Sequence, residues 1–142
     1  MVRSHPLPDD TSSRKRAEKV GRRAEKLCAI WLRLKGYRIL ATRYKSPAGE
    51  IDIVARRSNV LIAIEVKTRT DHATALHSIT ARQQERIARA LEIYAGRIGH
   101  GGDLRFDVMS VHGFGKIKHV KKCMAPCLTD KKPYPTKKMR FY

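Results

Sequence analysis

The stretch that decides the fold is residues 49–69, which read GEIDIVARRSNVLIAIEVKTR. Two runs rich in Ile and Val flank a short polar break at residues 57–59. Two β-branched runs around a turn signal are typical of a β-hairpin. With Ser58 and Asn59 at the turn, the pairing places Asp52 opposite Glu65.

Strand side chains alternate between two faces, so Asp52, Glu65 and Lys67 are expected on one face. The other face takes the apolar side chains Ile51, Ile53, Ile62, Ile64 and Val66. Glu50 falls opposite Lys67 in the same register. We interpret these two as an ion pair, with a second metal ligand as the alternative for Glu50.

The opposition of Asp52 and Glu65 needs compensation. Like charges directly across a strand pair are destabilising. A divalent cation between the carboxylates is one solution, since magnesium prefers oxygen ligands. With Lys67 beside it, such a site could hold and polarise a phosphodiester. The alternative is a solvent-exposed face on which Lys67 pairs with Glu50 and Glu65.

The ordered set of motifs resembles the YraN-like family of small bacterial proteins within the PD-(D/E)XK nuclease superfamily, similar to archaeal Holliday-junction resolvases. The resemblance runs from about Gly21 to Val120 and rests on Gly21…Glu25, residues 35–40, residues 49–52, residues 65–69 and residues 105–108. It implies a restriction-endonuclease-like α/β fold, a mixed sheet in α-β-β-β-α-β order flanked by helices. It also implies a metal-dependent endonuclease acting on DNA, including branched repair or recombination intermediates, and it suggests a homodimer.

The resemblance also implies roles for individual residues. Asp52 and Glu65 would bind Mg²⁺ or Mn²⁺, helped by Glu25 from the first helix and by the backbone carbonyl of Val66. Lys67 would orient or deprotonate the attacking water. Because nearby carboxylates oppose the lowered pKa that a lysine base needs, electrostatic positioning is the role we assign to Lys67.

Composition narrows the class of partner. The 142 residues include 31 Lys and Arg against 13 Asp and Glu, a formal charge of +18. This excess predicts a nucleic-acid partner, DNA ahead of RNA by the resemblance, rather than a membrane. No run of 18 apolar residues and no apolar signal core appear, and three cysteines fit a reducing compartment, so we expect a cytoplasmic protein.

The expected organisation is a disordered leader over residues 1–13, a nuclease-like domain over 14–120 and a basic, flexible tail over 121–142. A first helix is predicted from about Arg14 to Lys35, ended by Gly36. Its apolar positions are Val20, Ala24, Leu27, Trp31 and Leu34, and its opposite side carries Lys15, Lys19, Arg22, Arg23, Lys26 and Arg33. Glu25 shares a side with Cys28 and Leu32.

A second helix is predicted from Thr80 to about Arg97, begun by a capping box in which the Thr80 and Gln83 side chains satisfy free backbone N–H groups. Its expected buried stripe is Ile87, Leu91, Tyr94 and Ile98. Another face carries an arginine row, and near a nuclease site these side chains are expected to grip phosphates. The candidate nucleic-acid-binding residues are Arg69, Arg82, Gln83, Arg86 and Arg89.

Other candidates receive structural interpretations. Strands are expected over residues 37–44, 104–111 and 116–120, and Asp107 is interpreted as structural or supporting. His72 and His77, in a polar loop, are not assigned to metal. The spacing of His119, Cys123 and Cys127 does not match a zinc site, which has four ligands in tighter knuckles.

Two rival functions stay open from the sequence. One is a basic nucleic-acid-binding protein that keeps the nuclease fold without cutting. The other, RNA or ribosome association, is supported by charge alone. Retention of Asp52, Glu65 and Lys67 together favours catalysis.

Overall fold

The computed structural model describes residues 10–68, 79–113 and 115–122. Within them the chain forms α1 (Asp10–Leu34), β1 (Arg38–Ser46), β2 (Gly49–Arg57), β3 (Val60–Thr68), α3 (Ala81–Arg97), β4 (Asp103–His112) and β5 (Lys116–Lys122). This confirms the expected α/β fold. Some predictions concern residues outside these ranges: the leader through residue 9, Arg69, His72, His77, Cys123, Cys127 and the tail from residue 123.

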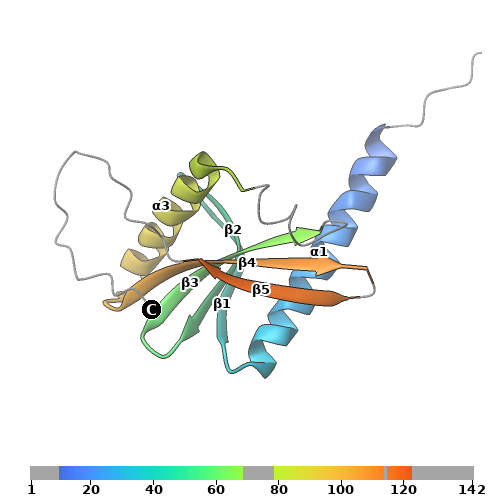
Figure 1. Cartoon of the computed structure of the whole chain (residues 1–142). Coiled ribbons are helices and arrows are strands. Elements are labelled where there is room, and N and C mark those ends of the chain that lie inside the picture. Colours follow the sequence, from blue (N-terminus) through green and yellow to red (C-terminus); the bar gives the residue numbers. More distant parts are fainter. Residues whose placement is uncertain (1–9, 69–78, 114, 123–142) are drawn as a thin grey trace, which may run out of the picture.

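The described strands form one mixed sheet in the order β1-β2-β3-β4-β5. Neighbours are antiparallel except β3 and β4, which run parallel from Val60–Asp103 to Thr68–Val111. A parallel pair needs a crossover connection, and α3 lies within it. Figure 1 shows α3 on one side of the sheet and α1 on the other. In the described part of the chain, neither helix is long and apolar enough to span a membrane.

The hairpin register is the predicted one, and its ladder is short. It runs from Arg57–Val60 to Ile53–Ile64 and ends there. Beyond that point β2 continues with β1, through pairs such as Lys45–Glu50, while β3 continues with β4. Strands β2 and β3 therefore separate next to the candidate residues Asp52 and Glu65.

Each face of the sheet has its own core. On the α1 side, Cys28 and Leu32 pack in a cluster with Ile53, Ile62 and Ile64. On the α3 side, the cluster contains Val54, Leu61, Ala63, Ile87, Leu91, Phe106 and Val108. Ile51 belongs to this second cluster, so its expected place beside Ile53 is wrong. The reason is that β2 leaves β3 at this point, so the alternation of the hairpin does not extend to Ile51.

Helix α1 begins at Asp10, ahead of the expected Arg14, and ends as predicted. Gly36 adopts a φ of 82°, and Tyr37 N–H donates to the Leu32 carbonyl at 3.0 Å. These are features of a glycine-terminated helix, in which the left-handed residue lets the chain satisfy free carbonyls.

The expected buried stripe of α1 is partly wrong. Val20, Leu27 and Leu34 are 47%, 46% and 83% exposed, whereas Cys28 and Leu32 are fully buried. The sheet accepts the narrow side of the helix, where Ala24 and Ala29 allow close approach. Glu25 was expected on the side of Cys28 and Leu32, and this is the side that faces the sheet.

Helix α3 also differs from expectation at its ends. Thr80 caps it by accepting from Gln83 N–H at 3.2 Å. The Gln83 side chain does not complete a capping box, since it donates to Glu65 instead. Ile87 and Leu91 are buried as expected, but Ile98 is 44% exposed because it lies past the helix end at Arg97.

Asp107 takes the structural role that was expected. Its carboxylate is fully buried and accepts from Arg105 Nε and Nη2, both at 2.8 Å. His119 Nε2 lies 2.8 Å from the same carboxylate and brings β5 into the network. The His119 ring also meets Trp31 and Tyr37 edge to face. This cluster ties β5, β4 and α1 together on the face opposite Glu65.

Candidate functional site

A cleft of about 500 Å³ opens where β2 and β3 separate beside the beginning of α3. Strand β2 contributes Asp52 and strand β3 contributes Glu65. The described residues that line it are Gly49, Glu50, Asp52, Glu65, Thr80, Arg82, Gln83, Arg86 and Ile87. The structure therefore brings the two predicted carboxylates to one cavity.

The parting of the strands positions Asp52. Its Oδ2 accepts a hydrogen bond from Val66 N–H at 2.8 Å, in the place of a continuing ladder. In an antiparallel arrangement a residue offers its N–H and its C=O to the same neighbouring strand. The Val66 carbonyl accordingly faces the gap that holds Asp52.

Glu65 is held by two donors. It is 8% exposed, and its Oε1 accepts from Lys67 Nζ and from Gln83 Nε2, each at 2.8 Å. Gln83 reaches it from the first turn of α3, so the helix start fixes the Glu65 side chain.

The electrostatics of the cleft show a shortage of positive charge around Asp52. Burial and the neighbouring Glu65 charge raise the pKa of Asp52 to about 7, while the Val66 N–H and Lys67 act in the opposite direction. The Glu25 charge contributes a further rise. Burial also raises the pKa of Glu25 itself, opposed by the Arg43 guanidinium. A cation placed among these carboxylates would remove the penalty.

Behind the cleft lies Cys28, which is fully buried. Burial, with the charges of Asp52 and Glu25, raises the pKa of its thiol to about 12. A thiol held protonated in this way is a poor nucleophile, so Cys28 serves as packing.

Glu50 does not make the predicted pair with Lys67. Its carboxylate lies 3.5 Å from Arg43 Nε, while Lys67 pairs with Glu65. The cause is again the separation of β2 from β3, which leaves β1 as the neighbour of Glu50. Arg43 has a φ of 53° and also approaches Glu18 of α1 at 4.0 Å. It thereby connects the first helix to the wall of the cleft.

The predicted nucleic-acid contacts divide into two groups. Arg82, Gln83 and Arg86 line the cleft, and Arg86 Nε also donates to the Ala48 carbonyl at 3.4 Å. Arg89 lies further along α3 and pairs with Glu85 at 2.6 Å. The structure thus supplies two arginines at the cleft, with Arg89 outside its lining.

The donor set fits a magnesium-like ion better than zinc. In the described residues, no group of three or more His, Cys, Asp or Glu side chains forms a ready cage. Magnesium is commonly bound by one or two carboxylates and several waters, whereas structural zinc takes four Cys or His ligands. Asp52, Glu65 and the Val66 carbonyl match the first pattern, with Glu25 close enough for its charge to affect Asp52.

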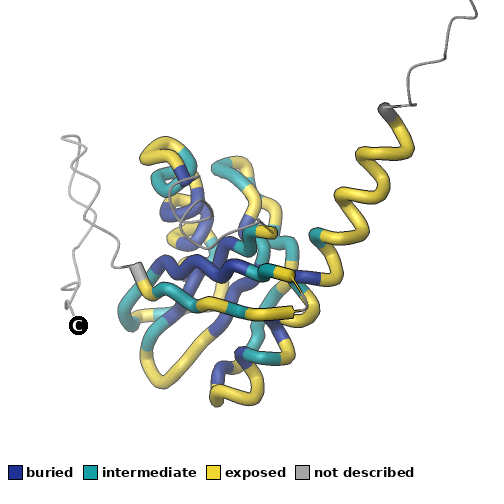
Figure 2. The backbone as a smooth tube through the Cα atoms, turned by 45° about the vertical axis from the view of Figure 1, so that its right-hand side comes forward, coloured by how far each residue is buried: buried dark blue, intermediate teal, exposed yellow. Residues whose placement is uncertain are grey.

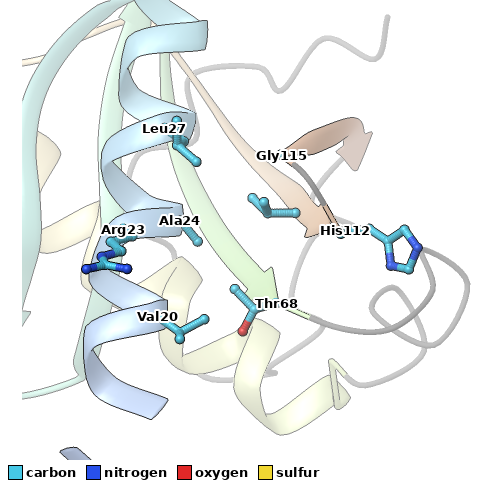
Figure 3. A pocket seen from close by; sticks show the side chains of 9 residues that line it. Val20, Arg23, Ala24, Leu27, Thr68, His112 and Gly115 are labelled. Carbon is cyan, nitrogen blue, oxygen red and sulfur yellow. The ribbon is translucent and has the colours of Figure 1, made fainter. Parts of the chain in front are cut away.

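Figure 3 shows a second hollow, of about 610 Å³, between α1 and the end of β4. Its described lining is mainly apolar, with Val20, Ala24 and Leu27 from the helix and Val111 from the strand. Among the described residues that line it there is no carboxylate. Its larger volume therefore does not make it the better candidate for metal chemistry.

Comparison with known proteins assigns the chain to a family. Residues 24–111 match the model of "Uncharacterised protein family UPF0102". The chain belongs to this family. The matched span includes Asp52, Glu65, Lys67 and Gln83. It also includes β2 and β3, the two strands that build the cleft.

Relatives within UPF0102 cover most of the chain. A UPF0102 protein of Parvibaculum lavamentivorans is 47% identical over 97 residues, 67% of this chain and 73% of the relative. One from Maricaulis maris is 50% identical over 103 residues, which are 71% of this chain and 81% of the relative. One from Caulobacter sp. (strain K31) is 39% identical over 127 residues, which are 84% of this chain and 91% of the relative.

Sequence reasoning missed two contacts at the cleft. Gln83 was predicted as half of a capping box and as a nucleic-acid contact near the site, and its bond to Glu65 depends on how α3 docks after the crossover. Arg43 was placed in a strand without a role, although it lies beside Glu50. The pairing of β1 with β2 could have indicated the second contact, since Lys45 is the partner of Glu50 and Arg43 lies two residues before it.

Proposed function

We propose that this protein is a metal-dependent nuclease that hydrolyses phosphodiester bonds in nucleic acid, with DNA as the favoured substrate. The observation that carries the proposal is the meeting of Asp52 and Glu65 in one cleft, beside Lys67 and at the point where two strands part. Carboxylates so placed lower stability, and residues that lower stability in this way are expected at functional sites.

Asp52 and Glu65 would hold Mg²⁺ or Mn²⁺, with the Val66 carbonyl as a further oxygen donor and Glu25 helping through its nearby charge. When bound, the ion supplies Lewis-acid polarisation of the phosphate and lowers the pKa of a coordinated water. Gln83 keeps the Glu65 carboxylate in position through its 2.8 Å bond. Such supporting bonds orient metal ligands and affect metal affinity.

Lys67 acts as an electrostatic group in this proposal. Its Nζ lies 2.8 Å from Glu65 Oε1, and this ion pair holds the ammonium beside the carboxylates. An ammonium at this place orients the attacking water and offsets negative charge that develops on the phosphate.

Arg82 and Arg86 face the cleft and are suited to contact phosphates on either side of the scissile bond. Arginine binds phosphate through paired N–H donors, which position a strand without reading its sequence. The formal charge of +18 gives the whole chain the long-range attraction for a polyanion.

A non-catalytic nucleic-acid-binding protein is the second candidate. It is favoured by one observation: Lys67 and Gln83 satisfy Glu65 without an ion. The two functions differ in their response to metal, since binding through phosphates needs none.

The test is cleavage of a panel comprising a four-way junction, a flap, single-stranded DNA, duplex DNA and structured RNA, with Mg²⁺, Mn²⁺ or EDTA. Wild type is compared with Asp52→Asn and Lys67→Ala, and with Glu92→Gln as a control that neutralises an exposed carboxylate on α3. We expect metal-dependent cleavage that both site variants abolish and the control retains. Equal binding by all four proteins without cleavage would refute the nuclease.

A further inference from the structure

The first turns of α1 are exposed, and Ser12, Arg16 and Val20 line a hollow with Thr68 at the end of β3. Every residue from 11 to 20 is exposed, and the first buried residue of the helix is Ala24. Figure 2 shows this part of α1 projecting beyond the sheet. We call residues 11–23 of this helix the arm, and thirteen helical residues span about 20 Å.

The arm is strongly cationic on its outward side. Lys15, Lys19 and Arg23 recur every four residues and form one stripe, which lies opposite the buried side marked by Cys28 and continues past the arm to Lys26. These residues are exposed, and so is Arg16, three residues before Lys19. Like charges four residues apart on a helix cost about 0.2–0.5 kcal/mol per pair. A bound polyanion would reverse that cost.

The arm has little apolar surface to offer a protein or lipid partner. Within residues 11–20 the apolar side chains are Ala17 and Val20. The exposed Leu27, Ile30 and Leu34 lie further along α1. The chemistry of the arm itself therefore favours a partner that binds through phosphate oxygens.

The arm is connected to the cleft at its root. Glu18 accepts from Arg22 at 2.5 Å and approaches Arg43 at 4.0 Å, and Arg43 in turn lies 3.5 Å from Glu50 in the cleft wall. Arg43 therefore lies between the cleft wall at Glu50 and the root of the arm at Glu18, so the two features are neighbours.

We propose that the arm binds double-helical DNA that flanks the strand held in the cleft, with Lys15, Arg16, Lys19 and Arg23 contacting its phosphates. A helix is about 10–12 Å across, which matches the roughly 12 Å major groove of B-form DNA. The A-form major groove of duplex RNA is deep and narrow and does not admit a helix. A single strand has no groove at all. This inference rests on the proposed function and names duplex DNA as its substrate class, with the scissile strand held in the cleft.

The test is binding, measured by fluorescence anisotropy in EDTA with the full chain. The ligands are a duplex DNA, a duplex RNA and a single-stranded DNA of one sequence. The arm variant changes Lys15, Arg16, Lys19 and Arg23 to Gln, which keeps helix propensity close to that of the original residues. The control changes Arg33, Arg38, Arg97 and Lys116 to Gln; these are exposed residues outside the arm, and the net charge is the same.

We expect the arm variant to lose duplex-DNA affinity by about 30-fold or more at 0.1 M salt, with a salt slope lower by about 3–4. The control, and the arm variant with RNA or single strands, should change by less than about threefold. Equal losses in arm and control variants would overturn the inference, and so would equal losses for DNA and RNA duplexes. Arm-dependent binding to anionic lipid vesicles, with none to duplex DNA, would also overturn it.

The outcome separates this inference from the proposed function. Arm-dependent binding to duplex DNA without metal-dependent cleavage would leave the arm assignment standing and remove the nuclease. Metal-dependent cleavage with no effect of the arm substitutions would support the nuclease and remove the arm assignment. Thermal unfolding of both variants checks that the fold is retained.

Discussion

Neutralising Asp52 should stabilise the metal-free protein, and the gain should grow with pH. The pKa of Asp52 is about 7 in the folded chain against an ordinary value of 3.8. A carboxyl with a raised pKa favours the folded state while it is protonated. That contribution is lost as pH rises from about 4 to about 7, because the unfolded chain releases the proton first.

The magnitude follows from the shift. One pKa unit corresponds to 1.36 kcal/mol, so the raised pKa of Asp52 lowers the free energy of unfolding by about 4 kcal/mol at pH 9 and by about 1.5 kcal/mol at pH 5. Asparagine keeps an oxygen for the Val66 N–H bond and removes the charge. Asp52→Asn should therefore raise the free energy of unfolding by up to these amounts.

The assay is urea unfolding in EDTA at pH 5, 7 and 9, with Glu92→Gln as an exposed control. The control should change by less than about 0.5 kcal/mol at every pH. Adding Mg²⁺ at about 100 times its Kd should stabilise wild type by about 2.7 kcal/mol and leave Asp52→Asn unchanged. A variant that is less stable than wild type at pH 9, or a gain independent of pH, would refute the reasoning.

Three further predictions concern neighbouring features. Gln83→Ala should weaken Mn²⁺ binding about tenfold in a calorimetric titration, because it releases a metal ligand, while the adjacent Gln84→Ala should not. Asp107→Asn should lower the free energy of unfolding by about 3 kcal/mol, since it breaks a buried charge network; a loss below about 1 kcal/mol would contradict this. Gly102→Ala should lower the melting temperature, because its Cβ would lie 2.0 Å from the Asn59 carbonyl oxygen. Gly96→Ala, with open space around it in α3, should raise that temperature slightly, and a fall in both variants would show that the crowding at Gly102 is not the cause.

The sequence was sufficient for the hairpin and for the order of elements. The β-branched runs, Ser58 and Asn59 set the register seen in the structure. Periodicity and end signals located both helices, including the stop at Gly36. These features depend on interactions between residues near each other in the chain, which local patterns report well.

Features that depend on packing between distant segments were harder to predict. Both sides of α1 offer apolar residues, and the sheet selected the narrow side with Ala24 and Cys28 over the wider one with Leu27. A pattern of hydrophobicity alone does not contain that choice, since close approach of a helix to a sheet depends on side-chain size as well as polarity.

The separation of β2 from β3 explains the remaining differences at the site. The ladder ends at Ile53–Ile64. Glu50 therefore pairs with Arg43 instead of the predicted Lys67, and Ile51 packs in the core on the α3 side instead of beside Ile53. Regular alternation predicts a continuous hairpin. The departure lies at Asp52, where function would justify a break in local regularity.

The central claim is that Asp52 and Glu65 share one divalent cation. The most direct test is a crystal structure with Mn²⁺, in which the ion is located by its anomalous scattering, for wild type and for Asp52→Asn. The account predicts a Mn²⁺ peak within about 2.0–2.3 Å of oxygens from both carboxylates in wild type, and no peak there in the variant. Wild-type crystals in which Mn²⁺ binds elsewhere, with Glu65 still held by Lys67 and Gln83, would contradict it.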